Sequence, residues 1–171
     1  MFRFNYFSLV FFLLFSFTCS AEVINVSGNI IASPCVLDLD NSDFQVNFSK
    51  MYKGLFSKPG SYGTEKNIRI TVKSCPPTTS YVEFHFDGQP DNGDSLSFSN
   101  SGSAENLAVQ IKSLSETWEN TSIYPGSYVK IPIETKTNTA LLSMVARPYT
   151  KVGGGTSGTL RTTVNITLSY Q

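Results

Sequence analysis

The chain ends on residues 160–171, LRTTVNITLSYQ, the longest clean alternation of apolar and polar side chains in the sequence. Successive residues of a β-strand point to opposite faces, so a strand that covers a core on one side shows a period of two. One face would carry Leu160, Thr162, Val164, Ile166, Leu168 and Tyr170. The opposite face would carry Arg161, Thr163, Asn165, Thr167 and Ser169. The stretch therefore predicts one half-buried β-strand from Leu160 to Tyr170.

Short stretches with the same alternation recur upstream, and helical periodicity is almost absent. Their apolar positions are Phe44, Val46 and Phe48; Ile68, Ile70 and Val72; Val82, Phe84 and Phe86; Leu107, Val109 and Ile111; and Val129, Ile131 and Ile133. A further run covers 141–149, and Pro132 places the strand that contains it toward a sheet edge, because proline cannot donate to a ladder. Turn residues separate the runs, and only 113–124, around Trp118, has no pattern that predicts a structure. Many short strands divided by turns predict an all-β sandwich, formed by one domain from Glu22 to Gln171.

The first 21 residues have the composition of a secretory signal peptide. Arg3 is their one basic residue, an apolar Phe/Leu-rich run follows, and small residues lead to Ala21. The apolar run is too short for a spanning helix, so we expect an exported protein without membrane insertion. Lipid attachment at Cys19 is the alternative, but Ser16 stands where a lipoprotein signal usually has leucine. Cleavage after Ala21 would remove 21 of the 171 residues and leave 150.

Charge and cysteine content narrow the possible partners of this exported chain. Without Arg3, 12 basic and 13 acidic residues remain, a net charge of −1 that favours neither nucleic acid nor an anionic membrane. Without Cys19, the cysteines that remain are Cys35 and Cys75. An even pair in an exported chain predicts a disulfide between them.

No motif for catalysis, cofactor binding or metal binding fits its context. Gly153, Gly155 and Gly158 match the spacing of a dinucleotide-binding loop, but a strand rather than a helix follows them. His85 is the only histidine and would lie on a strand surface, so a metal site with several histidines is excluded. The acidic clusters 38–43 and 87–94 have the composition of turns and lack the spacing of an EF-hand. We therefore expect no enzyme, no cofactor and no metal.

Residues 22–36, EVINVSGNIIASPCV, form a second alternating stretch directly after the predicted leader. Its apolar face would consist of Ile24, Val26, Gly28 and Ile30. A strand at a free chain end can pair with the sheet edge of another molecule. The segment 22–31 is therefore a candidate for strand donation between chains.

The order of these features resembles the subunits of chaperone–usher fimbriae, the pilins of type 1-like pili on Gram-negative bacteria. The resemblance covers the whole mature chain. It rests on Gly28 with Cys35 seven residues later in GNIIASPC, on Cys75 at the end of NIRITVKSC, and on the ending TTVNITLSYQ with its penultimate Tyr170.

The resemblance implies an incomplete immunoglobulin-like β-sandwich that lacks its final strand and is completed by donor-strand complementation. A hydrophobic groove would lie open beside the last strand, walled partly by Val164, Ile166 and Leu168 and followed by Tyr170. A periplasmic chaperone would first fill the groove and hold the carboxylate of Gln171. At an outer-membrane usher, the leading segment of a neighbouring pilin would replace the chaperone strand. Ile24, Val26, Gly28 and Ile30 would enter a neighbour's groove in the same way, with Gly28 where no side chain has room.

The implied function is that of a structural subunit of a fimbria on the bacterial surface, which supports cell adhesion. Its partners would be the chaperone, the usher, neighbouring pilins and, where the fimbria has one, a tip adhesin. Only six residues, 22–27, precede Gly28 after the expected cleavage, which is short for a donor strand in this family. The alternative is a self-contained, secreted carbohydrate-binding β-sandwich that holds sugar with Trp118, Tyr124 and the acidic loops.

Overall fold

The computed structural model describes residues 35–171, and the predictions for the leader and for the segment 22–31 lie outside this range. Its regular elements are β1 (Val36–Leu37), η2 (Leu39–Asn41), η3 (Lys53–Phe56), β2 (Lys66–Lys73), β3 (Tyr81–Asp87), β4 (Phe98–Ser99), β5 (Ala108–Ser113), β6 (Ser127–Pro132), β7 (Ala140–Tyr149) and β8 (Asn165–Tyr170). The only helices in this part of the chain are the short 3-10 turns η2 and η3, so the all-β prediction is confirmed. None of the helices described is long and apolar enough to cross a bilayer.

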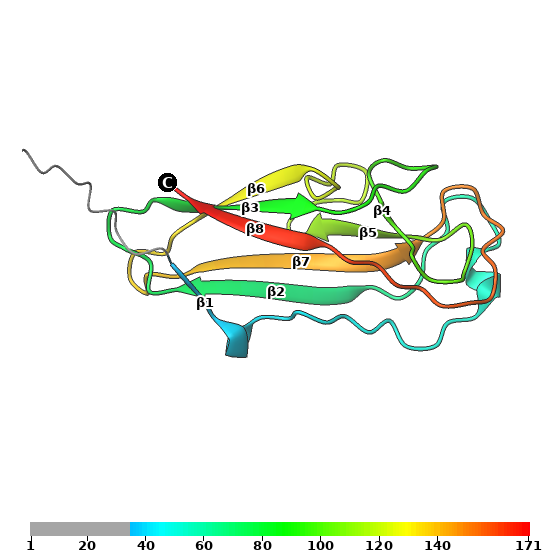
Figure 1. Ribbon diagram of the computed structural model, residues 1–171, viewed down its shortest axis with the longest axis horizontal. Coiled ribbons are helices and arrows are strands. Elements are labelled where there is room, and N and C mark those ends of the chain that lie inside the picture. The colour runs from blue at the N-terminus through cyan, green and yellow to red at the C-terminus, as the bar shows by residue number, and fades with distance from the viewer. Residues whose placement is uncertain (1–34) are drawn as a thin grey trace, which may run out of the picture. The chain divides into compact units, whose positions relative to one another are not determined.

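The strands form two sheets that face each other (Figure 1). One sheet has the order β1-β2-β7-β5-β4 and the other the order β6-β3-β8, and every pairing is antiparallel. β6, which ends at Pro132, lies at the edge of the second sheet, as the proline predicted. β8 forms the opposite edge of that sheet.

The core lies between the two sheets and consists of the apolar faces of the predicted strands. Ile70 and Val72 of β2 are 5% and 0% exposed, and Phe84 of β3 is 0% exposed. Leu142 and Met144 of β7 pack into the same cluster. The period of two therefore selects the buried face of these strands, because every second side chain enters the core.

The prediction of a strand at 44–48 is wrong. Asp43 is joined to Arg69 of β2 by two hydrogen bonds, from its own amide to the Arg69 carbonyl and from the Arg69 amide to its carboxylate. Beyond Asp43, no backbone hydrogen bond joins residues 44–51 to another segment of the described chain. The alternation is still meaningful, because Val46 and Phe48 pack against the core although the backbone is unpaired.

The last strand is also shorter than the predicted range from Leu160 to Tyr170. β8 begins at Asn165, where its partner strand β3 ends at Asp87. Residues upstream bond to the loop after β4 instead: the Arg161 carbonyl accepts from the amide of Ser101. The alternation of apolar and polar side chains therefore begins before the hydrogen-bonded strand β8, because side-chain burial continues where strand pairing stops.

A disulfide joins Cys35 to Cys75, as predicted from the pair of cysteines that remains without Cys19. Both cysteines belong to the core cluster and are nearly inaccessible to solvent. The disulfide joins the residue just before β1 to the loop after β2. The strands β1 and β2 also pair with each other.

Candidate functional site

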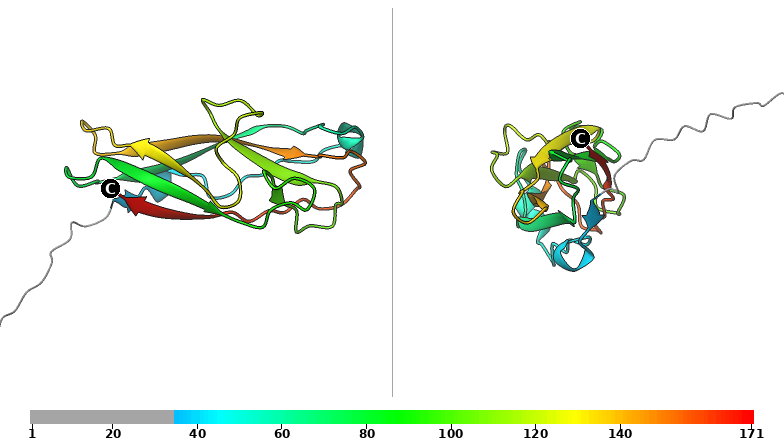
Figure 2. Two further views of the ribbon diagram at one scale, coloured as in Figure 1. Left: turned by 90° about the horizontal axis from the view of Figure 1, so that it is seen from above. Right: turned by 90° about the vertical axis from the view of Figure 1, so that its left-hand side faces the viewer.

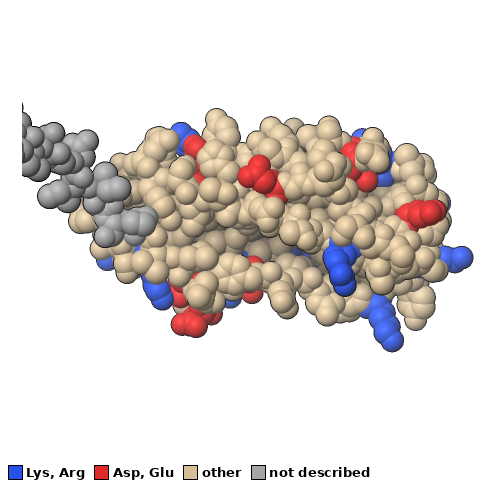
Figure 3. All heavy atoms as spheres, in the orientation of Figure 1, with Lys and Arg blue, Asp and Glu red and all other residues tan. Residues whose placement is uncertain are grey.

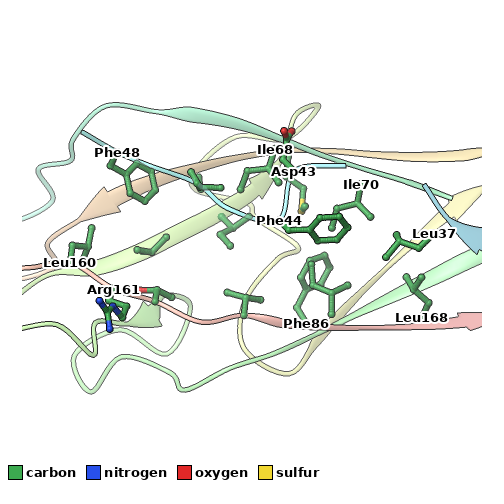
Figure 4. A pocket seen from close by; sticks show the side chains of 18 residues that line it. Leu37, Asp43, Phe44, Phe48, Ile68, Ile70, Phe86, Leu160, Arg161 and Leu168 are labelled. Carbon is green, nitrogen blue, oxygen red and sulfur yellow. The ribbon is translucent and has the colours of Figure 1, made fainter. Parts of the chain in front are cut away.

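A groove of about 420 Å³ opens between β8 and residues 43–48 (Figure 4). β8 pairs with β3 on one side only, and no described strand pairs with its other side. The segment 43–48 forms the facing wall, where it is attached to β2 through Asp43. The groove therefore follows the open side of the sandwich, and a hollow among mostly uncharged atoms is visible on this face (Figure 3).

Apolar side chains line the groove almost throughout. Its floor is the buried core, with Ile68, Ile70, Phe86, Val109, Ile111, Met144 and Ala146. Its walls are Leu37, Phe44, Val46 and Phe48 on one side and Leu160, Thr162, Val164, Ile166 and Leu168 on the other. Most wall residues are only half-buried, and Phe44 is 56% exposed. Half-covered apolar walls above a buried floor are what a sandwich shows when one strand is absent.

Charge occurs at the groove only in Asp43 and Arg161, which are both exposed. The Asp43 carboxylate already accepts a hydrogen bond from the Arg69 amide at 2.9 Å. An occupant would therefore be selected by apolar side chains and by its capacity to pair with a strand edge, rather than by charge.

Val164, Ile166 and Leu168 line the groove. Tyr170 and Gln171 lie beyond the lining. The hydroxyl of Tyr170 donates to the Cys35 carbonyl at 3.3 Å. The main-chain oxygen of Gln171 accepts from the amides of Ser80 and Tyr81, at 2.7 and 3.1 Å.

The sequence did not identify the facing wall as part of the site. The alternation of Phe44, Val46 and Phe48 predicts a strand and does not indicate a groove wall. Leu37, between Val36 and Asp38, was not assigned to the site either. Ile24, Val26, Gly28 and Ile30, the candidate donor residues, lie outside the described residues.

His85 lies on the outer face of the three-stranded sheet, away from the groove. Its Nε2 is 2.7 Å from Oε1 of Glu83, and Lys130 Nζ is 3.3 Å from the other carboxylate oxygen. Burial opposes the charge of Glu83, but the hydrogen bonds from Lys130 and His85 outweigh it and lower the pKa of Glu83. Glu83 thus joins the other two side chains on the surface of the sheet.

Residues 114–124 form an irregular loop that brings Trp118 onto Arg147 of β7. The Arg147 Cζ lies 3.9 Å from the Trp118 ring centroid, and the indole N–H donates to Glu65 Oε1 at 2.8 Å. Burial lowers the pKa of Arg147, an effect that Glu65 and the neighbouring tyrosines Tyr62 and Tyr149 oppose. The indole that a sugar-binding site would need is therefore engaged within the chain.

The glycine-rich stretch after β7 leads into β8 without a helix, as expected of a strand connection. Gly153 and Gly154 adopt positive φ values of 80° and 68° there. In the part of the chain that the structure describes, no three or more His, Cys, Asp or Glu side chains gather as metal ligands.

These features fit the result of comparison with known proteins. Residues 24–171 match the family described as Fimbrial protein. The chain belongs to this family. As a fimbrial protein it is a subunit of a surface pilus, and its partners include other pilins.

Relatives of this fimbrial protein span nearly its full length. The uncharacterized fimbrial-like protein YdeR of Escherichia coli K12 is 26% identical over 92% of this chain and 91% of its own. Protein FimG of the same strain is 25% identical over 86% of this chain and 83% of its own. The crystal structure of the Burkholderia pseudomallei antigen and type I fimbria protein BPSL1626 has the same fold, with a TM-score of 0.57. It is 22% identical and covers 82% of this chain and 91% of its own.

Proposed function

We propose that this fimbrial protein polymerises by strand donation, with the groove beside β8 as its acceptor site. The supporting observation is the apolar groove along the unpaired side of β8. An extended segment of a neighbouring subunit would enter it and add a strand to the sheet β6-β3-β8. The proposal is structural and includes no catalytic step.

The groove offers an incoming strand a sheet edge on one side and an unpaired backbone on the other. The backbone groups on the free side of β8 would form a ladder with the occupant, and residues 44–51 have no backbone partner in another described segment. Each aliphatic side chain that enters would contribute about 1.5–3 kcal/mol by burial. Several such side chains and a ladder would give a noncovalent joint that releases slowly.

The segment 22–31 is the donor that this chain would provide. Ile24, Val26 and Ile30 match the apolar character of the groove walls, and Gly28 would allow close approach of the two backbones. Its single charged residue is Glu22, so the segment is nearly as uncharged as the groove.

Before assembly, the open groove would need a substitute strand, because an exposed apolar surface and a free sheet edge favour aggregation. A periplasmic chaperone would provide that strand, and an outer-membrane usher would exchange it for a pilin segment. The finished fimbria would then present the subunit at the cell surface, where it supports adhesion.

Thermal unfolding of an oxidised fragment, residues 32–171, tests the proposal with a synthetic peptide of residues 22–31. We expect the melting temperature to rise with peptide concentration, as mass action requires of a ligand that binds only the folded state. The matched control is the same peptide with Ile24, Val26 and Ile30 replaced by asparagine. Equal melting temperatures with both peptides and without peptide would show a domain that needs no donor.

A second test uses the full chain in bacteria. Filaments are sheared from cells and probed for the mature protein, with deletion of 22–31 as the variant. We expect the unaltered chain in the filaments and the deleted chain only in the periplasm or as degraded protein. Recovery of the unaltered chain solely as a soluble monomer would contradict the proposal.

A further inference from the structure

Two side chains occupy the edge of β2 at the point where the facing wall of the groove begins. The amide of Thr71 donates to Ser42 Oγ at 2.9 Å, and the amide of Arg69 donates to Asp43 Oδ2, also at 2.9 Å. In an antiparallel ladder such amides bond to main-chain carbonyls of the neighbouring strand. Ser42 and Asp43 therefore cap this edge of β2 with side-chain oxygens.

The hydrogen bonds at Asp43 are those of a ladder that starts and does not continue. The Asp43 amide donates to the Arg69 carbonyl at 2.7 Å, which is one half of the exchange between two opposed residues of an antiparallel pair. The carboxylate, rather than the Asp43 carbonyl, completes the exchange. The next pair in this register would be Gln45 with Asn67, and no backbone hydrogen bond joins them. The side chain thus replaces the carbonyl that would draw the following residues onto β2.

The residues that follow Asp43 have the side-chain pattern of a strand. Phe44, Val46 and Phe48 line the groove, and the polar residues between them are exposed. The chain runs here from η2 toward η3, which lies at the opposite end of the sandwich from the C-terminus (Figure 2). A segment with strand alternation beside an open sheet edge would ordinarily extend that sheet. The two capped amides explain why this segment forms a wall instead.

We propose that the Asp43 carboxylate, together with Ser42 Oγ, keeps the acceptor groove open by preventing residues 44–48 from joining β2. If the ladder continued, these residues would belong to the sheet of β2, and their apolar side chains would no longer face β8 across the groove. An incoming strand would keep its ladder with β8 and lose the facing wall. Asp43 is thus a positioning residue of the acceptor site. This inference rests on the proposed function.

The test introduces Asp43→Val into the full exported chain. The reference chain carries Ile24→Asn and Val26→Asn in every form, so that it accepts a strand and does not donate one. Valine has no side-chain acceptor, so the Arg69 amide is expected to bond to the main-chain carbonyl of residue 43. Asp43→Asn keeps an acceptor oxygen and removes the charge. The matched control is Asp40→Val, because Asp40 is an exposed aspartate of η2 that does not cap β2.

Hydrogen–deuterium exchange without any peptide measures the amides of Gln45 and Asn67. We expect Asp43→Val to slow the exchange of both about tenfold or more, and Asp43→Asn and Asp40→Val to leave it unchanged. Fluorescence anisotropy of a labelled 22–31 peptide then measures affinity. We expect binding about tenfold weaker for Asp43→Val and within about twofold of the reference for the other two. The free energy of unfolding of Asp43→Val should not fall below that of the reference, because one hydrogen bond is exchanged for a ladder.

Unchanged exchange of both amides in Asp43→Val overturns the inference. Weak binding by Asp43→Asn also overturns it, because the charge rather than the acceptor oxygen would then be responsible. A purely structural role predicts that Asp43→Val loses affinity and unfolding free energy together, and that result would contradict a positioning role. If the reference chain binds no peptide, the proposed function fails, while the exchange measurement still decides whether Asp43 keeps residues 44–48 off β2.

Discussion

The indole of Trp118 covers the guanidinium of Arg147, with 3.9 Å between the ring centroid and Cζ. Tyr62 approaches the same Cζ at 4.2 Å, and Nε and one terminal nitrogen of Arg147 donate to Gln110 Oε1. A charge on the outer face of the five-stranded sheet is thereby satisfied by aromatic rings and one amide, and Glu65 Oε1 lies 3.9 Å from one of its nitrogens. The loop 114–124 is held to the sheet by this contact.

Replacement of Trp118 by leucine tests the contribution of this contact to stability. The change removes the cation–π contact and the hydrogen bond to Glu65, and we expect the free energy of unfolding to fall by roughly 1–2 kcal/mol. Urea unfolding followed by circular dichroism measures it, because Trp118 is the only tryptophan. Tyr124→Leu, at a more exposed site of the same region, is the control and should change the value by less than about 0.5 kcal/mol. Equal effects of the two variants would contradict this prediction.

Ile166→Asn tests the groove wall. Ile166 lines the groove, whereas Thr167 is exposed on the opposite face of β8. Loss of one buried aliphatic contact should weaken binding of the 22–31 peptide roughly tenfold to a hundredfold, since burial contributes about 1.5–3 kcal/mol. Thr167→Asn should leave the affinity unchanged. Fluorescence anisotropy of a labelled peptide gives both dissociation constants, and similar values for the two variants would place the binding surface elsewhere.

Removal of the disulfide by Cys35→Ser together with Cys75→Ser should lower the free energy of unfolding by about 4 kcal/mol. The bridge closes a loop with a sequence separation of 40, and the chain-entropy model relates that length to the stabilisation. Replacing both cysteines avoids a free thiol. Urea unfolding of the double variant and of the reduced, unaltered chain should give matching losses, and an unchanged midpoint in both would disprove the estimate.

Gly153→Ala should destabilise the connection between β7 and β8. Gly153 has a φ of 80°, and a methyl group there would lie 2.8 Å from backbone atoms of Ser57 and Lys58. We expect a loss of about 1–3 kcal/mol in the free energy of unfolding. Gly54→Ala is the matched control because a methyl group at Gly54 meets no atom within 4 Å. If the two variants melt at the same temperature, the close approach at Gly153 carries no energetic cost.

The ion pair of Asp38 and Lys73 predicts that the free energy of unfolding falls at acid pH. Lys73 Nζ donates to Asp38 at 2.9 Å, and this hydrogen bond, with a second from Asn41, lowers the pKa of Asp38 below its usual 3.8. A carboxyl whose folded-state pKa is lowered stabilises the fold above its unfolded-state pKa, and that stability is lost as pH falls through the folded-state pKa. The difference in unfolding free energy between the unaltered chain and Asp38→Asn should therefore be constant near neutral pH and shrink below about pH 3.8.

Urea unfolding across this pH range measures the Asp38 effect. Lys73→Met should reduce the same acid-dependent contribution, because it removes the larger of the two hydrogen bonds that lower the pKa of Asp38 and leaves that from Asn41. If the difference in unfolding free energy between the unaltered chain and Asp38→Asn persists unchanged into strong acid, the ion pair does not cause the loss of stability at low pH.

Local pattern alone identified most strands and the buried face of each. The alternations around Ile70, Phe84 and Ile111 correspond to β2, β3 and β5, because a period of two is a property of each strand by itself. The same pattern at Phe44–Phe48 did not distinguish a paired strand from an extended segment whose side chains alone are buried. Whether a segment pairs with a neighbouring strand depends on residues distant in sequence, here on β2, whose Arg69 bonds, within this segment, to Asp43 alone. The local alternation of side chains contains no information about such a partner.

The sequence by itself determined the all-β class, the cysteine pair, the edge position of β6 and the apolar face of the last strand. Each of these follows from the chemistry or spacing of neighbouring residues. Only the tertiary structure decided that residues 43–48 face β8 across an open groove, that Leu37 closes one end of it, and that Tyr170 reaches Cys35. These relations join residues separated by up to 135 positions, and they exist only once two sheets pack and leave one side of the sandwich without a strand.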